Sequence, residues 1–160
     1  MGLIAAVAGT VIALDALTKW AATQYLAGER RSEVLGGLFH LNFYRNFAGP
    51  DNAFQGHTAL ISVLGILAVL AIFLASLRVT RTLTAVAIGL LLGGAIGNLL
   101  DRLLREPSPL HGGVIDWLQI ASRAQAMNLA DIAINIGVGL ILIAAILAWI
   151  RNDDAPEPHR

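Results

Sequence analysis

The sequence predicts an all-α membrane protein, a bundle of four transmembrane helices with a small extracytoplasmic β element and a short interfacial segment. Hydrophobic residues make up 56% of the 160 residues and charged residues only 14%, whereas about 25% of an ordinary soluble domain is charged. The mean hydropathy is +0.69. Four mostly apolar stretches are long enough to cross a bilayer, and they leave room for one compact domain. They are residues 3–22, 58–77, 83–100 and 129–150.

The first stretch is predicted to be a retained helix rather than a signal peptide. No basic segment precedes it, and Asp15 interrupts the run where a signal peptide would stay apolar. The turn between the second and third stretches contains Arg78 and Arg81 and no acidic residue, so the positive-inside rule places it in the cytoplasm. Both termini are then cytoplasmic. The long connections, residues 23–57 and 101–128, lie on the outer face, although they also contain arginines.

The outer connections are predicted to hold the irregular parts of the fold. Residues 39–44 alternate in the period-two pattern of a half-buried strand, and a Gly-Pro-Asp-Asn breaker follows at residues 49–52. Prolines and glycines at residues 107–113 forbid a continuous helix in the second connection. Residues 114–127 fit either a short strand or an amphipathic helix on the membrane surface. Residues 151–160 are predicted to form a disordered tail.

Polar residues inside three of the spans fall on single helix faces near the outer ends. They are Gly94, Asn98, Asp101 and Arg102 in the third span, Asn128, Asp131 and Asn135 in the fourth, and Asp15 with Lys19 in the first. The pair in the first span has the spacing of an ion pair. Gly93 and Gly97 leave room for a neighbouring helix to approach closely. We expect the three polar faces to converge at one depth in the membrane.

Each polar face also has a purely structural explanation. The acid and the lysine of the first span can neutralise each other and hold their helix at the interface. The polar group of the third span fits an interhelical hydrogen-bond cluster as well as it fits a reactive site. Asn128 followed by Asp131 resembles an N-cap and an acid in the first helical turn. Spacing alone leaves these alternatives open.

Two aspartates at the edges of hydrophobic segments indicate acid–base chemistry. Asp116 lies in G-G-V-I-D-W-L and Asp131 in N-L-A-D-I-A-I. A carboxylate close to hydrocarbon is unfavourable by several kcal/mol unless it is solvated, paired or functional. Two carboxylates near one water cannot both ionise cheaply, so we expect them to share a proton and titrate as a coupled pair. The sequence does not assign which of them acts as the base.

Several other classes of function are disfavoured by composition. The net charge is zero, so no nucleic-acid partner is implied, and the absence of cysteine excludes thiol catalysis and disulfides. The four histidines lack metal-ligand spacing, and neither an H-E-x-x-H nor a G-x-S-x-G motif is present. We therefore expect no metal and no cofactor.

Four sequence blocks carry a resemblance to the lipoprotein signal peptidases (signal peptidase II), which are membrane aspartic proteases with four spans. L-D-A-L-T-K at residues 14–19 is similar to the family's D-x-x-S/T-K, and G-G-A-I-G-N-L-L-D-R at residues 93–102 resembles its G-N-L-I-D-R motif. V-I-D-W at residues 114–117 resembles V-V-D-F, and N-L-A-D-I-A-I at residues 128–134 resembles F-N-x-A-D-S-A-I. Together with the four spans, the resemblance covers essentially the whole chain.

The resemblance implies an aspartic endopeptidase in which Asp116 and Asp131 are catalytic. Four residues would bind or position the substrate, and they are Asn46, Asn98, Arg102 and Asn128. Three would support the site, and they are Asp15, Lys19 and Asp101. The implied substrate is the signal peptide of a bacterial prolipoprotein, cut before its diacylglyceryl-modified cysteine. The implied location is the bacterial inner membrane, with the site near the outer face and in contact with membrane lipid, and we expect a monomer.

The chain departs from the family in two outer loops, with apparent insertions at residues 49–52 and 106–111. We expect the first of these turns to move as a lid over the substrate. Two alternatives belong to other classes of function, a divergent non-catalytic paralogue and a small four-helix membrane carrier. A carrier needs polar groups along its whole path, whereas the cytoplasmic halves of the spans are almost entirely apolar.

Overall fold

The structure, a computed structural model, describes residues 1–28, 32–49, 53–107, 109–122 and 125–153. Four long helices account for most of it. They are α1 (Gly2–Tyr25), α2 (Thr58–Ser76), α3 (Thr82–Leu104) and α4 (Leu129–Asp153). Each is long and apolar enough to cross a membrane, so the four predicted spans are confirmed.

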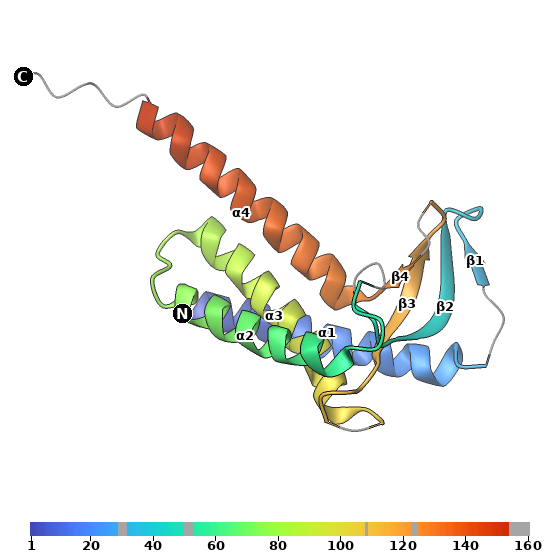
Figure 1. Cartoon of the computed structure of the whole chain (residues 1–160). Coiled ribbons are helices and arrows are strands. Elements are labelled where there is room, and N and C mark those ends of the chain that lie inside the picture. Colours follow the sequence, from blue (N-terminus) through green and yellow to red (C-terminus); the bar gives the residue numbers. More distant parts are fainter. Residues whose placement is uncertain (29–31, 50–52, 108, 123–124, 154–160) are drawn as a thin grey trace, which may run out of the picture.

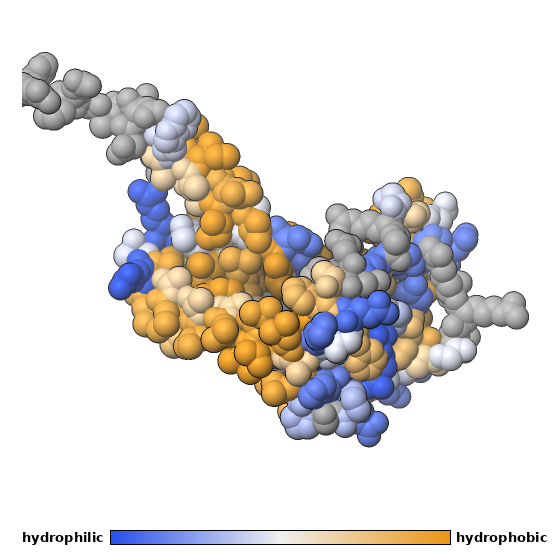
Figure 2. Space-filling model, viewed as in Figure 1, coloured by the Kyte–Doolittle hydropathy of each residue, from blue (hydrophilic) through white to orange (hydrophobic). Residues whose placement is uncertain are grey.

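Helix α3 lies at the centre of the bundle and packs against each of the other three helices. In Figure 1, α4 diverges from the other helices toward its C-terminal end, while its N-terminal end lies close to the small sheet. Figure 2 shows apolar side chains covering the helices, with hydrophilic side chains gathered at the sheet and at the turn between α2 and α3. This banding is what a bilayer-spanning bundle requires.

Glycines on two faces of α3 allow its neighbours to approach. A Cβ atom at Gly93 would lie 2.8 Å from the carbonyl oxygen of Ala8 on α1, and one at Gly97 would lie 2.7 Å from Asp15 Oδ2. The close approach predicted at these two glycines is therefore confirmed. On another face, a Cβ at Gly94 would lie 2.5 Å from the carbonyl oxygen of Ala130 on α4. Without side chains at these positions, polar groups of α1 and α4 reach the same level of α3.

An antiparallel sheet caps one end of the bundle. Its strands are β1 (Ser32–Val34), β2 (Phe39–Asn46), β3 (Val114–Ile120) and β4 (Ala126–Met127), paired in that order. The strand predicted at residues 39–44 is confirmed as part of β2. In the segment 114–127 the strand alternative is confirmed at residues 114–120 and 126–127, and the described residues of this segment form no surface helix. The reason is long-range pairing, because the backbone of β2 pairs with that of β3 in an antiparallel ladder, with Tyr44 opposite Asp116.

Some boundaries differ from those expected from sequence. Helix α3 continues to Leu104. Residues 101–104, which were predicted to belong to the outer connection, therefore form one more helical turn. Helix α4 continues to Asp153, into the predicted tail, because no helix-breaking residue precedes Pro156. Residues 154–160 of that tail, and residues 50–52 of the expected lid, lie outside the described part of the chain.

Candidate active site

Asp116 lies on β3, in the stretch that pairs with the end of β2. Its side chain is buried, with 2% of the residue exposed. Asn128 Nδ2 donates to Asp116 Oδ1 at 2.7 Å, and Asn46 Nδ2 donates to Asp116 Oδ2 at 3.1 Å. Each carboxylate oxygen therefore accepts one amide hydrogen bond, which fixes the orientation of the group.

Asp131 lies in the first turn of α4, where the helix N-terminus favours negative charge. The backbone N–H of Asn128 donates to Asp131 Oδ2 at 3.1 Å, and the backbone N–H of Asp131 donates to Asn128 Oδ1 at 3.0 Å. This reciprocal pattern is a capping box, and it confirms the N-cap predicted at Asn128. The second carboxylate oxygen, Oδ1, accepts a bond from Asn98 Nδ2 at 2.8 Å.

Hydrogen bonds of Asn128 connect Asp116 with the residues that surround Asp131. Its side-chain oxygen accepts the cap bond from α4, so its Nδ2 points the other way, toward Asp116 Oδ1 and toward Asn98 Oδ1 at 3.0 Å. Because Asn128 is completely buried, no water competes for these bonds. The amides of Asn98 and Asn128 thus have defined orientations, with each donating to one aspartate.

Asn46, the last residue of β2, also contacts Asp116. The backbone N–H groups of Ala48 and Gly49 donate to Asn46 Oδ1 at 3.1 and 2.9 Å, a local Asx-type turn. With its oxygen occupied in this way, Asn46 presents its Nδ2 group to Asp116. The turn that ends the strand therefore also aims the amide.

Arg102 approaches the cavity from the last turns of α3. It is buried, and its Nη1 atom has no hydrogen-bond partner within the part of the chain that the structure describes. A buried guanidinium nitrogen left without a partner is unfavourable. This nitrogen is therefore available to a carbonyl or carboxylate oxygen of a bound molecule.

A buried ionic cluster lies next to the two aspartates and is centred on Lys19. The lysine Nζ is 2.7 Å from Asp15 Oδ2 and 3.0 Å from Asp101 Oδ2, and it donates to Asn98 Oδ1 at 3.0 Å. The ion pair predicted in the first span is confirmed, and it extends to α3. Asp15 Oδ1 also accepts the backbone N–H of Ala130 at 2.9 Å, which ties α1 to the start of α4. This lysine cluster holds three helices in register beside the site.

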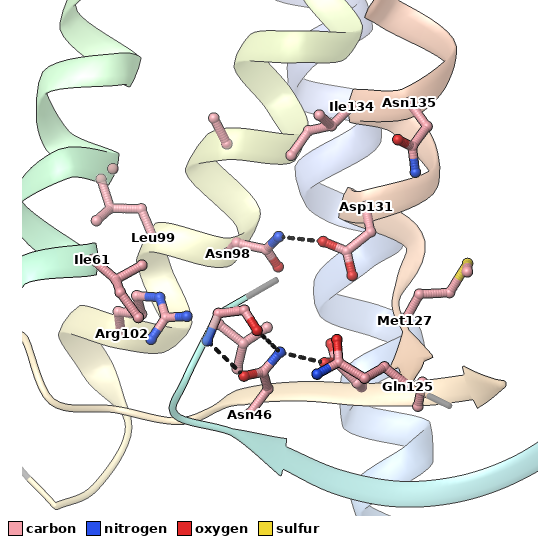
Figure 3. Close-up of a pocket in the computed structure, with 16 residues that line it drawn as sticks. Asn46, Ile61, Asn98, Leu99, Arg102, Gln125, Met127, Asp131, Ile134 and Asn135 are labelled. Atoms are coloured by element: carbon pink, nitrogen blue, oxygen red, sulfur yellow. Dashed lines mark hydrogen bonds between the residues drawn. The ribbon is translucent and has the colours of Figure 1, made fainter. Parts of the chain in front are cut away.

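A cavity of about 740 Å³ opens between the sheet and helices α2, α3 and α4. Five of its lining residues carry the polar groups predicted for the site, and they are Asn46, Asn98, Arg102, Asp116 and Asp131. Figure 3 shows Asn98 and Asp131 facing each other across the hydrogen bond that joins α3 to α4, with Arg102 and Asn46 nearby. Asn128, Asp15, Lys19 and Asp101 support this wall from behind rather than lining the cavity.

The electrostatic environment of Asp116 favours the protonated form of its carboxyl group. The pKa of Asp116 is raised to about 7, first because the carboxyl is buried and second because the charge of Asp131 is near. Hydrogen bonds from Asn46 and Asn128 act in the opposite direction, as does the charge of Lys19. Near neutral pH, Asp116 can therefore carry a proton and donate it.

Some lining residues were not assigned to the site from sequence. Ile61 and Gly65 of α2 and Leu99 of α3 form an apolar wall, and nothing in their local sequence distinguishes them from other membrane-facing residues. Asn135 also lines the cavity. Its spacing from Asp131 was visible in the sequence, but only the structure shows that both residues border one space.

Comparison with known proteins gives the family. A sequence model described as signal peptidase (SPase) II matches residues 7–147. A lipoprotein signal peptidase of Leifsonia xyli is 37% identical, covering 90% of this chain and 67% of that protein. One of Shouchella clausii is 34% identical, covering 92% of this chain and 94% of that protein.

Two solved structures of bacterial membrane enzymes share the fold. One has a TM-score of 0.80 at 24% identity, covering 100% of this chain and 96% of the other. The second has a TM-score of 0.77 at 25% identity, covering 91% of this chain and 93% of the other. The four-span fold, the family match over most of the length and the similarity to relatives agree, and the chain belongs to the signal peptidase II family.

Proposed function

We propose that this chain is an aspartic endopeptidase that removes the signal peptide of bacterial prolipoproteins by cutting before the diacylglyceryl-modified cysteine. The observation that supports this most strongly is the pair Asp116 and Asp131. Both line one cavity at the sheet end of a membrane-spanning bundle, and amide donors orient both carboxylates. Such a site can bring a peptide bond and a water molecule together beside apolar helices.

In the proposed mechanism, Asp131 is the base and Asp116 is the acid. Asp131 removes a proton from water, the water oxygen attacks the peptide carbonyl carbon, and Asp116 donates its proton to the carbonyl oxygen. The tetrahedral intermediate then loses its amine, which takes up the proton held by Asp131. The hydroxyl proton returns to Asp116 as the new carboxyl group forms. No acyl-enzyme is formed.

The residues around the pair would position the substrate. Arg102 Nη1 is without a protein partner among the described residues, and Arg102 lines the cavity in which a substrate carbonyl can lie. Donors placed in advance where charge develops are the most effective electrostatic contribution to catalysis. The apolar wall formed by Ile61 and Leu99 would contact the lipid chains or the signal helix. The site is complete within one chain, in keeping with a monomer.

The proposed topology places the site at the outer face of the bacterial inner membrane. Arg78 and Arg81 lie in the turn between α2 and α3, at the opposite end of the bundle from the sheet, as Figure 1 shows. The positive-inside rule assigns this turn to the cytoplasm. Both termini would then be cytoplasmic, and the sheet would contact the outer membrane surface and its lipid.

The described residues do not favour two other functions, serine catalysis and transport by a membrane carrier. Ser62 Oγ is buried and donates to backbone oxygens, including that of Leu110 at 2.6 Å, so it is not placed as a nucleophile. For a carrier, polar groups would have to continue along the bundle. On α4 the polar lining of the cavity stops at Asn135, and the residues from there to Trp149 are apolar.

The proposed reaction is tested with a synthetic diacylglyceryl prolipoprotein peptide and the purified chain in detergent. We expect a single cut before the modified cysteine, located by mass spectrometry, and at least about tenfold lower kcat/KM for the same peptide without lipid, because the apolar wall loses its partner. Added hydroxylamine should yield no hydroxamate, since no acyl-enzyme forms. Failure of the folded chain to cut would favour a non-catalytic paralogue, and a hydroxamate product would contradict direct attack by water.

The proton on Asp116 predicts the pH dependence. With a pKa raised to about 7, Asp116 is protonated below that pH and loses its proton above it. Activity should therefore fall as the pH rises through about 7. Asn46→Ala removes a donor that stabilises the carboxylate, so the pKa of Asp116 should rise and the alkaline limb should move to higher pH.

Asn42→Ala is the matched control for this shift. Asn42 lies on the same strand, but its Nδ2 donates to Gln119 Oε1 at 3.0 Å rather than to Asp116. The pH profile of the control should match that of the wild type. An alkaline limb that stays in place in Asn46→Ala would argue against Asp116 as the acid.

A further inference from the structure

One polar side chain in the cavity has no part in the mechanism described above. Asn135 lies on α4, four residues beyond Asp131, and is exposed rather than packed inside the bundle. Four residues of helix rise by about 6 Å, so Asn135 lies one turn farther from the sheet than Asp131. Both residues line the same cavity, and Figure 3 shows Asn135 on the turn of α4 next to that of Asp131.

Apolar residues share the cavity with Asn135. They include Ile134, which Figure 3 shows beside Asn135 on α4, together with Ala95 of α3 and Gly65 of α2. The helix is one of the four that can span a membrane. Among the described residues, no hydrogen bond of the Asn135 amide to a protein group is found. An amide that faces hydrocarbon without a partner is strongly unfavourable, and a polar residue retained there is a candidate for function.

A substrate cut at the aspartates would bring carbonyl groups to this place. Two residues of extended signal peptide reach about 7 Å from the scissile bond, which matches the rise from Asp131 to Asn135. The ester carbonyls of a diacylglyceryl group on the cysteine are also only a few single bonds from the scissile bond. Either carbonyl would meet the amide in a space with few competing donors, since the neighbouring walls are apolar.

We infer that Asn135 is a specificity-determining residue whose amide donates a hydrogen bond to a substrate carbonyl. This carbonyl lies one helical turn farther from the sheet than Asp131. This inference rests on the proposed function. The acceptor is a carbonyl in both cases, whether it belongs to a lipid ester or to the signal peptide. The bond forms on binding and persists through the reaction, so it contributes to KM rather than to kcat.

The test compares the wild type with Asn135→Leu on two lipidated peptides, one carrying the natural diacyl esters and one carrying dialkyl ethers without the ester carbonyls. Leucine is close to asparagine in size and suits the apolar surroundings, so the thermal midpoint should not fall. We expect KM for the diacyl peptide to rise by roughly 3- to 10-fold, the size of one hydrogen bond, with kcat within about twofold of the wild type.

The two peptides distinguish the sources of the carbonyl. If the acceptor is an ester, the wild type prefers the diacyl peptide and Asn135→Leu loses that preference. If the acceptor is a peptide carbonyl, the variant loses affinity equally for both substrates. An unchanged KM for both peptides would overturn the inference, because an amide that is only hydrated by cavity water does not discriminate.

A control variant and the wild-type activity make the other outcomes interpretable. Thr10→Leu makes a similar polar-to-leucine change on an exposed face of α1, where the Thr10 hydroxyl donates to Ala6 O of its own helix. KM should not change in this variant. If the folded wild type cuts neither peptide, the proposed function itself fails and the inference falls with it. If the wild type cuts both and Asn135→Leu behaves identically, only the role of Asn135 is contradicted.

Discussion

Asp131→Asn and Asp116→Asn should each lower kcat by about 10³-fold or more, because acid–base catalysis by a positioned carboxyl contributes roughly 10²- to 10⁴-fold and both halves of the proton exchange depend on the pair. An amide at position 131 cannot accept the proton of the attacking water. An amide at position 116 cannot deliver a proton to the carbonyl oxygen and then recover it. The measurement is turnover of a diacylglyceryl prolipoprotein peptide at saturating substrate.

The structure indicates that both variants will still fold. In Asp131→Asn, the new oxygen can keep the bond from Asn98 Nδ2, and the cap bond from the backbone N–H of residue 131 to Asn128 is unaffected. The backbone N–H of Asn128 loses its acceptor, at a cost of about 1–3 kcal/mol. In Asp116→Asn, the bond from Asn128 can remain while the donor of Asn46 faces another donor, at a cost of about 1–3 kcal/mol. A folding assay in the same detergent separates this local loss from the loss of catalysis.

Glu33→Gln is the matched control, because it removes one negative charge from an exposed position on β1. It should retain full turnover. The double variant Asp116→Asn/Asp131→Asn should be no slower than the worse single variant, since residues that act as a unit are not additive. Turnover by Asp131→Asn within tenfold of the wild type would contradict the proposed mechanism.

The second large effect concerns stability. Lys19→Met should lower the free energy of unfolding by about 3–5 kcal/mol, the usual effect of removing one partner from a buried ion pair. The lysine and Asp15 are each 1% exposed, and Asp101 is 6% exposed. Without the ammonium group, the carboxylate of Asp15 has no cation and Asn98 loses a donor to its oxygen. Unfolding in mixed detergent and dodecyl sulfate micelles measures the change.

Arg105→Met provides a matched comparison, because Arg105 pairs with the same Asp101. Its Nε lies 2.5 Å from Asp101 Oδ1, but its side chain is 31% exposed. Partly hydrated pairs contribute only about 1 kcal/mol or less, so this variant should be much more stable than Lys19→Met. Equal loss in the two variants would show that burial of the lysine cluster is not what stabilises the bundle.

The overall class of the fold was accessible from sequence because its signals are local. A bilayer demands about 20 consecutive apolar residues for each helix, and this requirement is visible within each span. The ion pair of Asp15 and Lys19 was predictable for the same reason, as one turn of a single helix brings the two together. The cap formed by Asn128 on α4 likewise involves residues three apart.

The choice of a strand for residues 114–120 could not be made locally. Their alternation suits a surface helix or a strand, and the decision depended on an open edge contributed by β2, about 70 residues earlier in the chain. That pairing also brings Asn46 to Asp116. The motif resemblance indicated that Asn46 belongs near the site, but not that the turn after β2 occupies its oxygen and leaves its amide to donate.

The sequence by itself determined the four spans, the chemical types of the polar groups and their end of the bundle, because composition and periodicity act over a few residues. Only the tertiary structure decided that Asp116 and Asp131 line one cavity, that Lys19 reaches Asn98 on another helix, and that Asn135 borders the same space. These arrangements depend on the glycine faces of α3, where the absence of side chains lets α1 and α4 come close. Distances between helices are set by such packing across the whole bundle, and no short segment of the sequence contains that information.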